Sequence, residues 1–175
     1  MGRRPVRVLV KDPKKYYKLV KELRVRGVPV SDLEGIEVRD SDLDGDILEA
    51  VGNLVAVSMG KETFEEIAVG IDTNTRQWLT VVVVGDGTIL EWKRTDLDNL
   101  CSYVKTVLRI YPHKREVVGV GVGNPLGLEV LNKLSSCSIE VKFVNEARTS
   151  RKTAYLDGDY PEDVIAAYNI AMRAL

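Results

Sequence analysis

The sequence predicts an α/β protein, with a five-stranded mixed sheet and flanking helices in residues 66–175 and a small α/β unit before them. Three observations favour this fold class. The 175 residues are 45% hydrophobic and 29% charged, which is typical of a globular chain with a real core. The dipeptide Asp86-Gly87 separates two apolar runs, as in a β-hairpin. After Thr95 the helix and strand patterns alternate, so the later strands are expected to be parallel.

The first unit, residues 1–60, shows its own alternation of strand and helix patterns. Valines alternate with other residues from Val6 to Val10, which predicts a short strand. Pro13 is expected to begin a helix, because proline is tolerated in a first turn, and Gly27 is expected to end it. The other expected elements are strands at 28–30 and 36–38, a turn at 40–46 and a helix from 47 to 55, with a boundary near 59–62.

The second unit begins near Glu66. Thr95, with Asp98 three residues later, is expected to cap a helix. Pro161 is expected to begin the last helix. The predicted strands are 67–71, 78–84, 88–92, 116–122 and 139–144, and the predicted helices are 95–110, 125–135 and 161–174. The resulting order, β-β-β-α-β-α-β-α, is that of the ribonuclease H-like fold.

The net charge of -1 hides a strong asymmetry along the chain. Residues 1–30 hold ten basic and two acidic side chains, whereas residues 31–66 hold eleven acidic and two basic ones. A basic segment is one feature of nucleic-acid-binding proteins. The favoured interpretation is a solvated helix face that the acidic segment neutralises, since charge runs are usually solvated faces.

Composition argues against several kinds of chemistry. The chain has one histidine and two cysteines, too few for His-rich or Cys-rich zinc sites. Cys101 and Cys137 form no recognisable framework, so we expect a reducing, cytoplasmic location. No apolar run approaches the ~18 residues of a membrane-spanning helix, and we expect no membrane partner. Any chemistry is therefore expected to depend on carboxylates.

Three acids follow elements that meet at the carboxyl edge of the predicted sheet. Asp72 ends the first strand, Glu146 follows the fifth, and Asp163 lies in the first turn of the last helix. Ligands bind at this edge in open α/β sheets. Three such carboxylates can hold Mg²⁺ or Mn²⁺, which prefer oxygen ligands. Ions of this kind assist phosphodiester hydrolysis.

Each acid also has a purely structural explanation. Asp72 is placed to cap a turn with the two residues after it, as aspartates often do. Asp163 is favoured at a helix N-terminus by the helix dipole. Glu146 is placed to pair with Arg148 at the surface. The joint placement of the three acids at one edge nevertheless favours a shared site.

Short segments around these acids resemble a known family. GIDTNT resembles the end of the family's first strand, VNEARTS its Asp-Glu-Arg-x-Thr/Ser segment, and DVIAAYNIA its closing Asp-x-x-Ala-Ala helix. Residues 66–175 are thus similar to the YqgF/RuvC-type branch of the ribonuclease H-like superfamily, and to archaeal proteins that carry this domain. The resemblance implies a metal-dependent nuclease, like Holliday-junction resolvases, with Asp72, Glu146 and Asp163 as catalytic metal ligands.

The chain departs from the family pattern at several places. Asn145 stands where the family has aspartate, and the fourth strand ends in GVGNP, where RuvC-type enzymes have a glutamate. Because asparagine cannot neutralise a cation, a non-catalytic nucleic-acid- or protein-binding module is the alternative function. An actin-like nucleotide-binding domain is disfavoured, since residues 1–60 are too short to supply its second half.

Two further features bear on partners. Arg148, Arg151 and Lys152 follow Glu146, and basic side chains beside a metal site suit the backbone of DNA or RNA. In VVGVGVGNP the glycines share one face of a strand, which predicts a closely packed helix, a groove open to a ligand, or both at opposite ends. That face, or the sheet edge, is also a candidate surface for a homodimer.

Two other patterns are expected to be structural. Asp40–Asp46 matches the start of an EF-hand calcium loop, but position 12 is Val51 instead of a bidentate glutamate, so a polar turn that caps the next helix is favoured. Trp78 and Trp92 lie on paired hairpin strands and are expected to serve packing.

Overall fold

The computed structural model describes residues 2–74, 77–147, 156 and 158–175. The chain forms two compact units. The first comprises Met1–Phe64 with Arg109–His113, and the second comprises Glu65–Leu108 with Lys114–Leu175. Residues 109–113 therefore fold with the first unit, although they lie within the span of the second along the chain.

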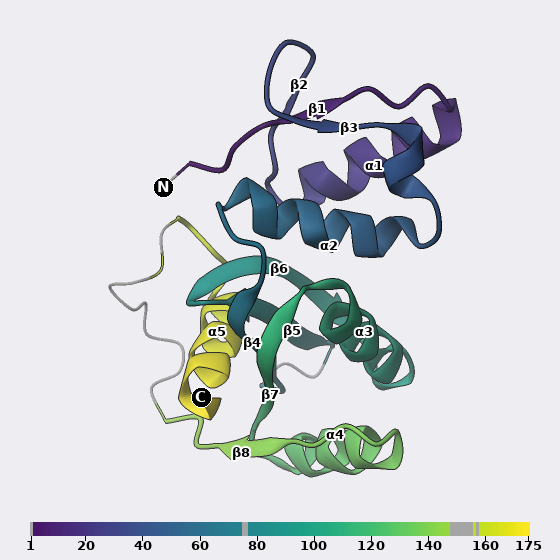
Figure 1. Ribbon diagram of the computed structural model, residues 1–175. Coiled ribbons are helices and arrows are strands. Elements are labelled where there is room, and N and C mark those ends of the chain that lie inside the picture. The colour runs from purple at the N-terminus through teal and green to yellow at the C-terminus, as the bar shows by residue number, and fades with distance from the viewer. Residues whose placement is uncertain (1, 75–76, 148–155, 157) are drawn as a thin grey trace. The chain divides into compact units, whose positions relative to one another are not determined.

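The first unit is a small parallel sheet with two helices (Figure 1). Its elements are β1 (Val6–Val8), α1 (Pro13–Val25), β2 (Val30–Ser31), β3 (Ile36–Val38), a 3-10 helix (Asp40–Leu43) and α2 (Ile47–Ser58). β1 pairs in parallel with both β2 and β3, which gives the strand order β2-β1-β3. Asp12 caps α1 by accepting the backbone N–H groups of Lys14 and Lys15 at 2.9 and 3.2 Å.

Apolar side chains of α1 and α2 form the core of the first unit. Leu23 of α1 and Val51 and Val55 of α2 are fully buried. Tyr111 is also buried, and Arg26 Nε donates a hydrogen bond to its hydroxyl oxygen at 3.0 Å. This buried hydrogen bond joins the segment 109–113 to α1, a link that no sequence pattern indicated.

The second unit is built on a five-stranded sheet. Its elements are β4 (Phe64–Asp72), β5 (Leu79–Gly85), β6 (Thr88–Thr95), α3 (Leu97–Ile110), β7 (His113–Gly121), α4 (Pro125–Ser136), β8 (Lys142–Val144) and α5 (Glu162–Ala174). The strand order is β6-β5-β4-β7-β8. β5 is antiparallel to β4 and to β6, whereas β7 and β8 are parallel. The predicted five-stranded mixed sheet, including its antiparallel first pair, is confirmed.

Strand register aligns three polar residues across this sheet. Asp72 of β4 lies opposite Thr80 of β5, and Thr80 lies opposite Arg94 of β6. The predicted hairpin turn begins the pairing of β5 with β6: Asp86 and Gly87 have φ angles of 47° and 86°, both in the left-handed region that a two-residue hairpin turn requires. A register shift between Val83 and Val84 then brings Arg94 opposite Thr80.

Glycines allow α5 to pack closely on one side of the sheet, while α3 lies on the other side (Figure 1). A side chain at Gly70 of β4 would overlap the carbonyl group of Ala167. A side chain at Gly119 of β7 would place its Cβ 2.7 Å from that of Ala174. At this end of the glycine-rich strand, the predicted close contact with the alanine-rich last helix is confirmed.

The predicted cap of α3 is wrong. α3 begins at Leu97, and Asp96 Oδ1 accepts the backbone N–H of Asn99 at 2.9 Å, so Asp96 caps the helix. Thr95 instead remains in β6, where it lies opposite Leu79. Continued pairing with β5 extends the strand past the point where the capping pattern placed its end.

The cysteines are joined, contrary to the expected reduced state. Cys101 of α3 and Cys137, the C-cap of α4, form a disulfide with their Cα atoms 6.5 Å apart. The fold brings together residues that no spacing pattern connects, so the cysteine argument for a cytoplasmic location no longer holds. Among the described residues, no helix combines the length and apolar character needed to cross a membrane.

Candidate functional site

Asp72 lies at the end of the central strand β4 and is only 2% exposed. The backbone N–H groups of Asn74 and Thr73 donate to its carboxylate, as expected for a residue that caps a turn. Its Oδ1 atom, however, is buried and has no hydrogen-bond partner in the described part of the chain. A buried, unpartnered carboxylate oxygen is energetically costly and therefore points to a ligand.

Glu146 lies against the glycine-rich end of β7. A side chain at Gly121 would overlap the Glu146 carboxylate, and a Cβ at Gly123 would lie 2.5 Å from Glu146 Oε2. The hydroxyl of Thr73 lies 3.4 Å from both Glu146 Oε1 and the carbonyl oxygen of Gly121, and can donate to either. The glycine face of β7 thus accommodates the Glu146 carboxylate at Gly121, while at Gly119 the same face accommodates α5.

Asn124 connects this site to the start of α4. Its Oδ1 accepts the backbone N–H of Gly127 at 3.2 Å, which caps the helix. Its amide donates to the carbonyl oxygen of Thr73 at 3.3 Å. An asparagine followed by proline is a recognisable helix start, so the cap could have been found from the sequence. Its contact with Thr73 could not, because it depends on tertiary structure.

Burial makes both carboxylates costly to ionise, and the charge of Glu146 adds to the cost at Asp72. Burial, followed by the charge of Glu146, raises the pKa of Asp72 to about 6, with Asp163 adding a smaller effect. Burial also raises the pKa of Glu146, and the Thr73 hydrogen bond opposes this change. A divalent cation between these acids would relieve both the repulsion and the desolvation cost.

Asp163 has a different set of partners. Arg94 donates from Nε to Asp163 Oδ2 at 2.9 Å and from Nη2 to Oδ1 at 3.1 Å. Thr80 Oγ1 and Trp78 Nε1 donate to the same Oδ2 at 2.6 and 3.2 Å. Hydrogen bonds from Arg94, and then from Thr80 and Trp78, hold the pKa of Asp163 well below its usual range. Asp163 is thus a charged, fully hydrogen-bonded partner of Arg94.

Arg94 also lies close to two aromatic rings. Its guanidinium is 4.8 Å from the ring of Trp78 and 5.4 Å from the ring of Trp92, distances typical of cation–π contacts. The predicted packing role is therefore only part of what these tryptophans do, since Trp78 also donates to Asp163. Strand alternation places residues 78 and 80 on one face of β5, and 92 and 94 on one face of β6, so the sequence held a signal for this cluster.

The candidate cation site therefore consists of Asp72 and Glu146, positioned by Thr73 and Asn124. These oxygen atoms suit a hard cation such as Mg²⁺ or Mn²⁺. In the described residues, no group of three or more His, Cys, Asp or Glu side chains is arranged to hold a metal. The remaining predicted binding residues, Arg148, Arg151 and Lys152, lie outside the described residues.

The acidic segment Asp40–Asp46 has structural partners. Asp40 accepts the backbone N–H groups of Lys11 and Asp12 at 2.7 and 3.1 Å. Asp42 accepts the backbone N–H of Arg39 at 2.8 Å, and Asp46 accepts that of Leu48 at 3.0 Å. These hydrogen bonds match the interpretation of this segment as a polar turn that caps α2.

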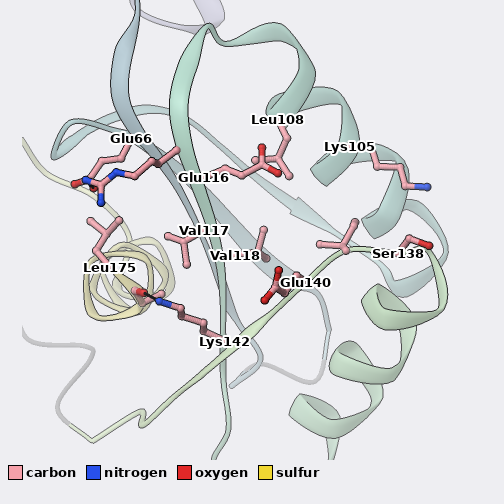
Figure 2. Close-up of a pocket in the computed structure, with 13 residues that line it drawn as sticks. Glu66, Lys105, Leu108, Glu116, Val117, Val118, Ser138, Glu140, Lys142 and Leu175 are labelled. Carbon is pink, nitrogen blue, oxygen red and sulfur yellow. Dashed lines mark hydrogen bonds and ion pairs between the residues drawn. The ribbon is translucent and has the colours of Figure 1, made fainter.

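A pocket of about 630 Å³ is lined by residues other than those of the candidate cation site (Figure 2). Its lining includes Val117 and Val118, in the middle of β7, and Lys142, the first residue of β8. The carboxyl ends of these strands lead instead toward Glu146. Three basic and three acidic side chains line the pocket, so its net charge favours neither anionic nor cationic ligands. These side chains are Lys105, Arg115, Lys142, Glu66, Glu116 and Glu140.

Comparison with known proteins adds no family assignment. No protein-family model matches the chain, and no curated protein matches it by sequence. The resemblance to YqgF/RuvC-type domains therefore rests on the three quoted sequence segments alone.

Proposed function

We propose that the second unit is a ribonuclease H-like domain of the YqgF/RuvC type that processes nucleic acid. In this proposal Asp72 and Glu146 hold a Mg²⁺ or Mn²⁺ ion used in phosphodiester hydrolysis. The observation that carries the proposal is Asp72 Oδ1, a buried oxygen without a hydrogen-bond partner in the described chain, beside a second carboxylate. The strand order β6-β5-β4-β7-β8 supports it, because only β7 separates β4, which ends in Asp72, from β8, which precedes Glu146.

Each residue of the site has a separate task. A divalent cation, when bound, stabilises charge on a phosphate group and lowers the pKa of water. Asp72 and Glu146 supply the negative charge that binds the cation. Thr73 and Asn124 hold the end of β4 against the start of α4, which fixes both carboxylates. Asp163 orients Arg94, whose guanidinium lies close to two indole rings.

A non-catalytic binding module is the second candidate function. The observation that favours it is the two-point ion pair between Arg94 and Asp163. An aspartate that is neutralised by arginine contributes little to cation binding, which leaves two carboxylates where the family pattern has more. A module of this kind would bind nucleic acid or protein without cleaving a phosphodiester bond.

Cleavage assays with end-labelled substrates test the proposed function. The substrates are single-stranded DNA, single-stranded RNA and a four-way DNA junction, each incubated with Mn²⁺ or with EDTA. We expect cleavage that requires Mn²⁺ and that falls by at least about 100-fold in Asp72→Asn and Glu146→Gln, since each removes a charged group that stabilises the reaction. Asp98→Asn, in the exposed first turn of α3, is the matched control. Cleavage that persists in Asp72→Asn contradicts the proposal, and a cation-binding protein without cleavage supports the binding module.

A further inference from the structure

The exposed face of α1 carries a row of cations around one aromatic ring. Four basic side chains and one tyrosine recur at intervals of three or four residues, so they lie on the same side of the helix. Tyr17 is 70% exposed. We call this row the basic stripe, and it consists of Lys14, Tyr17, Lys18, Lys21 and Arg24, all exposed.

The acidic segment that follows in the sequence does not neutralise the basic stripe by direct contact. In the described residues, none of its four cations forms an ion pair with a carboxylate. Three of the acids pair with other cations: Glu37 with Arg7 and Arg39, and Asp46 and Glu49 with Arg109. The stripe is thus a solvated helix face, as expected, but its charge is not neutralised through ion pairs with the acidic segment.

The charge of the basic stripe has a minor influence on Asp46 of the acidic segment. Lys18 lowers the pKa of Asp46, but it ranks after the hydrogen bonds from Arg109 and the backbone of Leu48. Asp12 and Glu22, the acids closest in sequence, are also engaged, Asp12 as the cap of α1 and Glu22 in an ion pair with Arg26 at 2.6 Å. The stripe is therefore positively charged without an acid among its members.

The spacing of the stripe fits a phosphate backbone. Ten residues separate Lys14 from Arg24, and at 1.5 Å per residue the stripe is about 15 Å long. A base-stacked strand rises about 3.4 Å per nucleotide, as one strand of a duplex does, so this length corresponds to about four nucleotides. Tyr17, between the cations, offers an exposed ring on which an unpaired base can stack.

A membrane surface fits the stripe less well. Amphipathic helices that bind membranes insert a continuous apolar face. The apolar face of α1 is already buried in the protein core, through Leu19, Val20 and Leu23. Among its cations the exposed face also carries Tyr17 and Val25, which are 70% and 67% exposed. This apolar area is small and not continuous, which favours an extended polyanion with unpaired bases.

We propose that the basic stripe of α1 is a docking surface for single-stranded nucleic acid, bound through its phosphates and through one base stacked on Tyr17. This inference names a partner surface for the proposed nucleic-acid function, and it stands on observations in the first unit alone. Binding by the stripe needs no cation, so its failure and the failure of the candidate cation site can be told apart.

Fluorescence anisotropy of a labelled 20-nucleotide single strand, titrated with the full chain in EDTA at 50 to 300 mM NaCl, tests the proposal. With four phosphate contacts, the slope of log Kd against log salt is expected to be about 3, so that Kd rises about 50-fold between 50 and 200 mM. The variant K14Q/K18Q/K21Q/R24Q should lose most of this slope. Tyr17→Ala should weaken binding about 10-fold or more, whereas Tyr17→Phe should not.

A charge-matched variant separates the stripe from net charge. K105Q/K114Q/R115Q/K142Q removes four exposed cations from the second unit and should retain the slope of the parent. Equal loss of slope in both quadruple variants overturns the proposal, as does an unchanged slope in the α1 variant. Binding of anionic phosphatidylserine vesicles without binding of the oligonucleotide also overturns it. Equal affinity for a duplex, with no effect of Tyr17→Ala, overturns the assignment to single strands.

Discussion

Asp72 combines deep burial with a neighbouring carboxylate, so its ionisation opposes folding. Its pKa is raised to about 6 in the folded chain, against about 4 for an unfolded aspartate. Below pH 4 the carboxyl is protonated in both states and has no effect on the free energy of unfolding. As the pH rises from 4 to 6, the unfolded chain releases this proton first, so stability falls and the loss persists above pH 6.

Asp72→Asn should therefore stabilise the protein at neutral pH and change its dependence on pH. We expect a gain of about 1–2 kcal/mol above pH 6, after allowance for solvent screening, and no gain near pH 4. Urea denaturation at pH 4, 5, 6 and 7 measures both quantities, with Asp98→Asn as the control. Parallel pH profiles for the parent and Asp72→Asn would show that Asp72 ionises normally.

Asp163 behaves in the opposite way, because Arg94 favours its charged form. The folded-state pKa of Asp163 is lowered, so the stability that it contributes is present above the unfolded pKa of about 4 and is lost as the pH falls further. Arg94→Met should lower stability at pH 7, by an amount that its exposure keeps modest, because it removes charge-assisted hydrogen bonds to Asp163.

A double-mutant cycle with Arg94→Met and Asp163→Asn measures this coupling. The two changes should be strongly non-additive, because both break the same ion pair. Trp78 and Trp92, the only tryptophans in the chain, lie close to Arg94, so intrinsic fluorescence should also change in Arg94→Met. Additive stabilities together with an unaltered emission spectrum would rule out the cluster.

At the scale of elements, the glycines of β4 and β7 have different roles and therefore different predicted effects. A Cβ at Gly70 meets the backbone of α5, which cannot move, whereas a Cβ at Gly121 meets the end of the Glu146 side chain. Gly70→Ala should destabilise the second unit by about 3 kcal/mol or more, as expected for overpacking against backbone.

Gly121→Ala should cost less than about 1 kcal/mol, because Glu146 can rotate away, but it should abolish cation binding. Thermal melts of both variants, with and without Mn²⁺, measure the two effects. A Gly121→Ala variant that binds Mn²⁺ as well as the parent would show that the position of Glu146 is unimportant.

The disulfide between α3 and α4 restricts the unfolded chain. It closes a loop across a separation of 36 residues, for which about 2–4 kcal/mol of stabilisation is expected. The Cys101→Ser/Cys137→Ser variant should unfold at correspondingly lower urea. The reducing agent dithiothreitol should lower the midpoint of the parent but not that of the variant. An identical midpoint for the parent in both conditions contradicts the disulfide.

Local patterns predicted most elements, and tertiary contacts explain the exceptions. The hairpin at Asp86-Gly87 and the alternation after it were sufficient to predict the five strands, because turn chemistry and hydrophobic period act within a few residues. The position of Asp72 at a strand end was also predictable. Two features of the site could not be predicted: the unpartnered oxygen of Asp72 and the ion pair of Asp163 with Arg94. They depend on strand register and on contacts between side chains 69 residues apart.

At the scale of the whole molecule, the chain combines two compact units with separate candidate surfaces. The first unit presents the basic stripe on α1, and the second holds the candidate cation site at the end of β4. Nucleic-acid binding by the basic stripe is measured in EDTA, and the candidate cation site is tested with Mn²⁺. The two proposals can therefore be supported or contradicted independently.

The central claim, that Asp72 and Glu146 bind a divalent cation, is tested most directly by thermal melts at pH 7 with and without Mn²⁺. If the free ion is present at about 100 times its Kd, binding stabilises the folded state by about 2.7 kcal/mol, and the Tm should rise by about 5–10 °C. Asp163→Asn should keep most of this rise, because Arg94 already neutralises Asp163, whereas Asp72→Asn and Glu146→Gln should lose it. No rise in the parent, or an equal rise in Asp72→Asn, would contradict the claim.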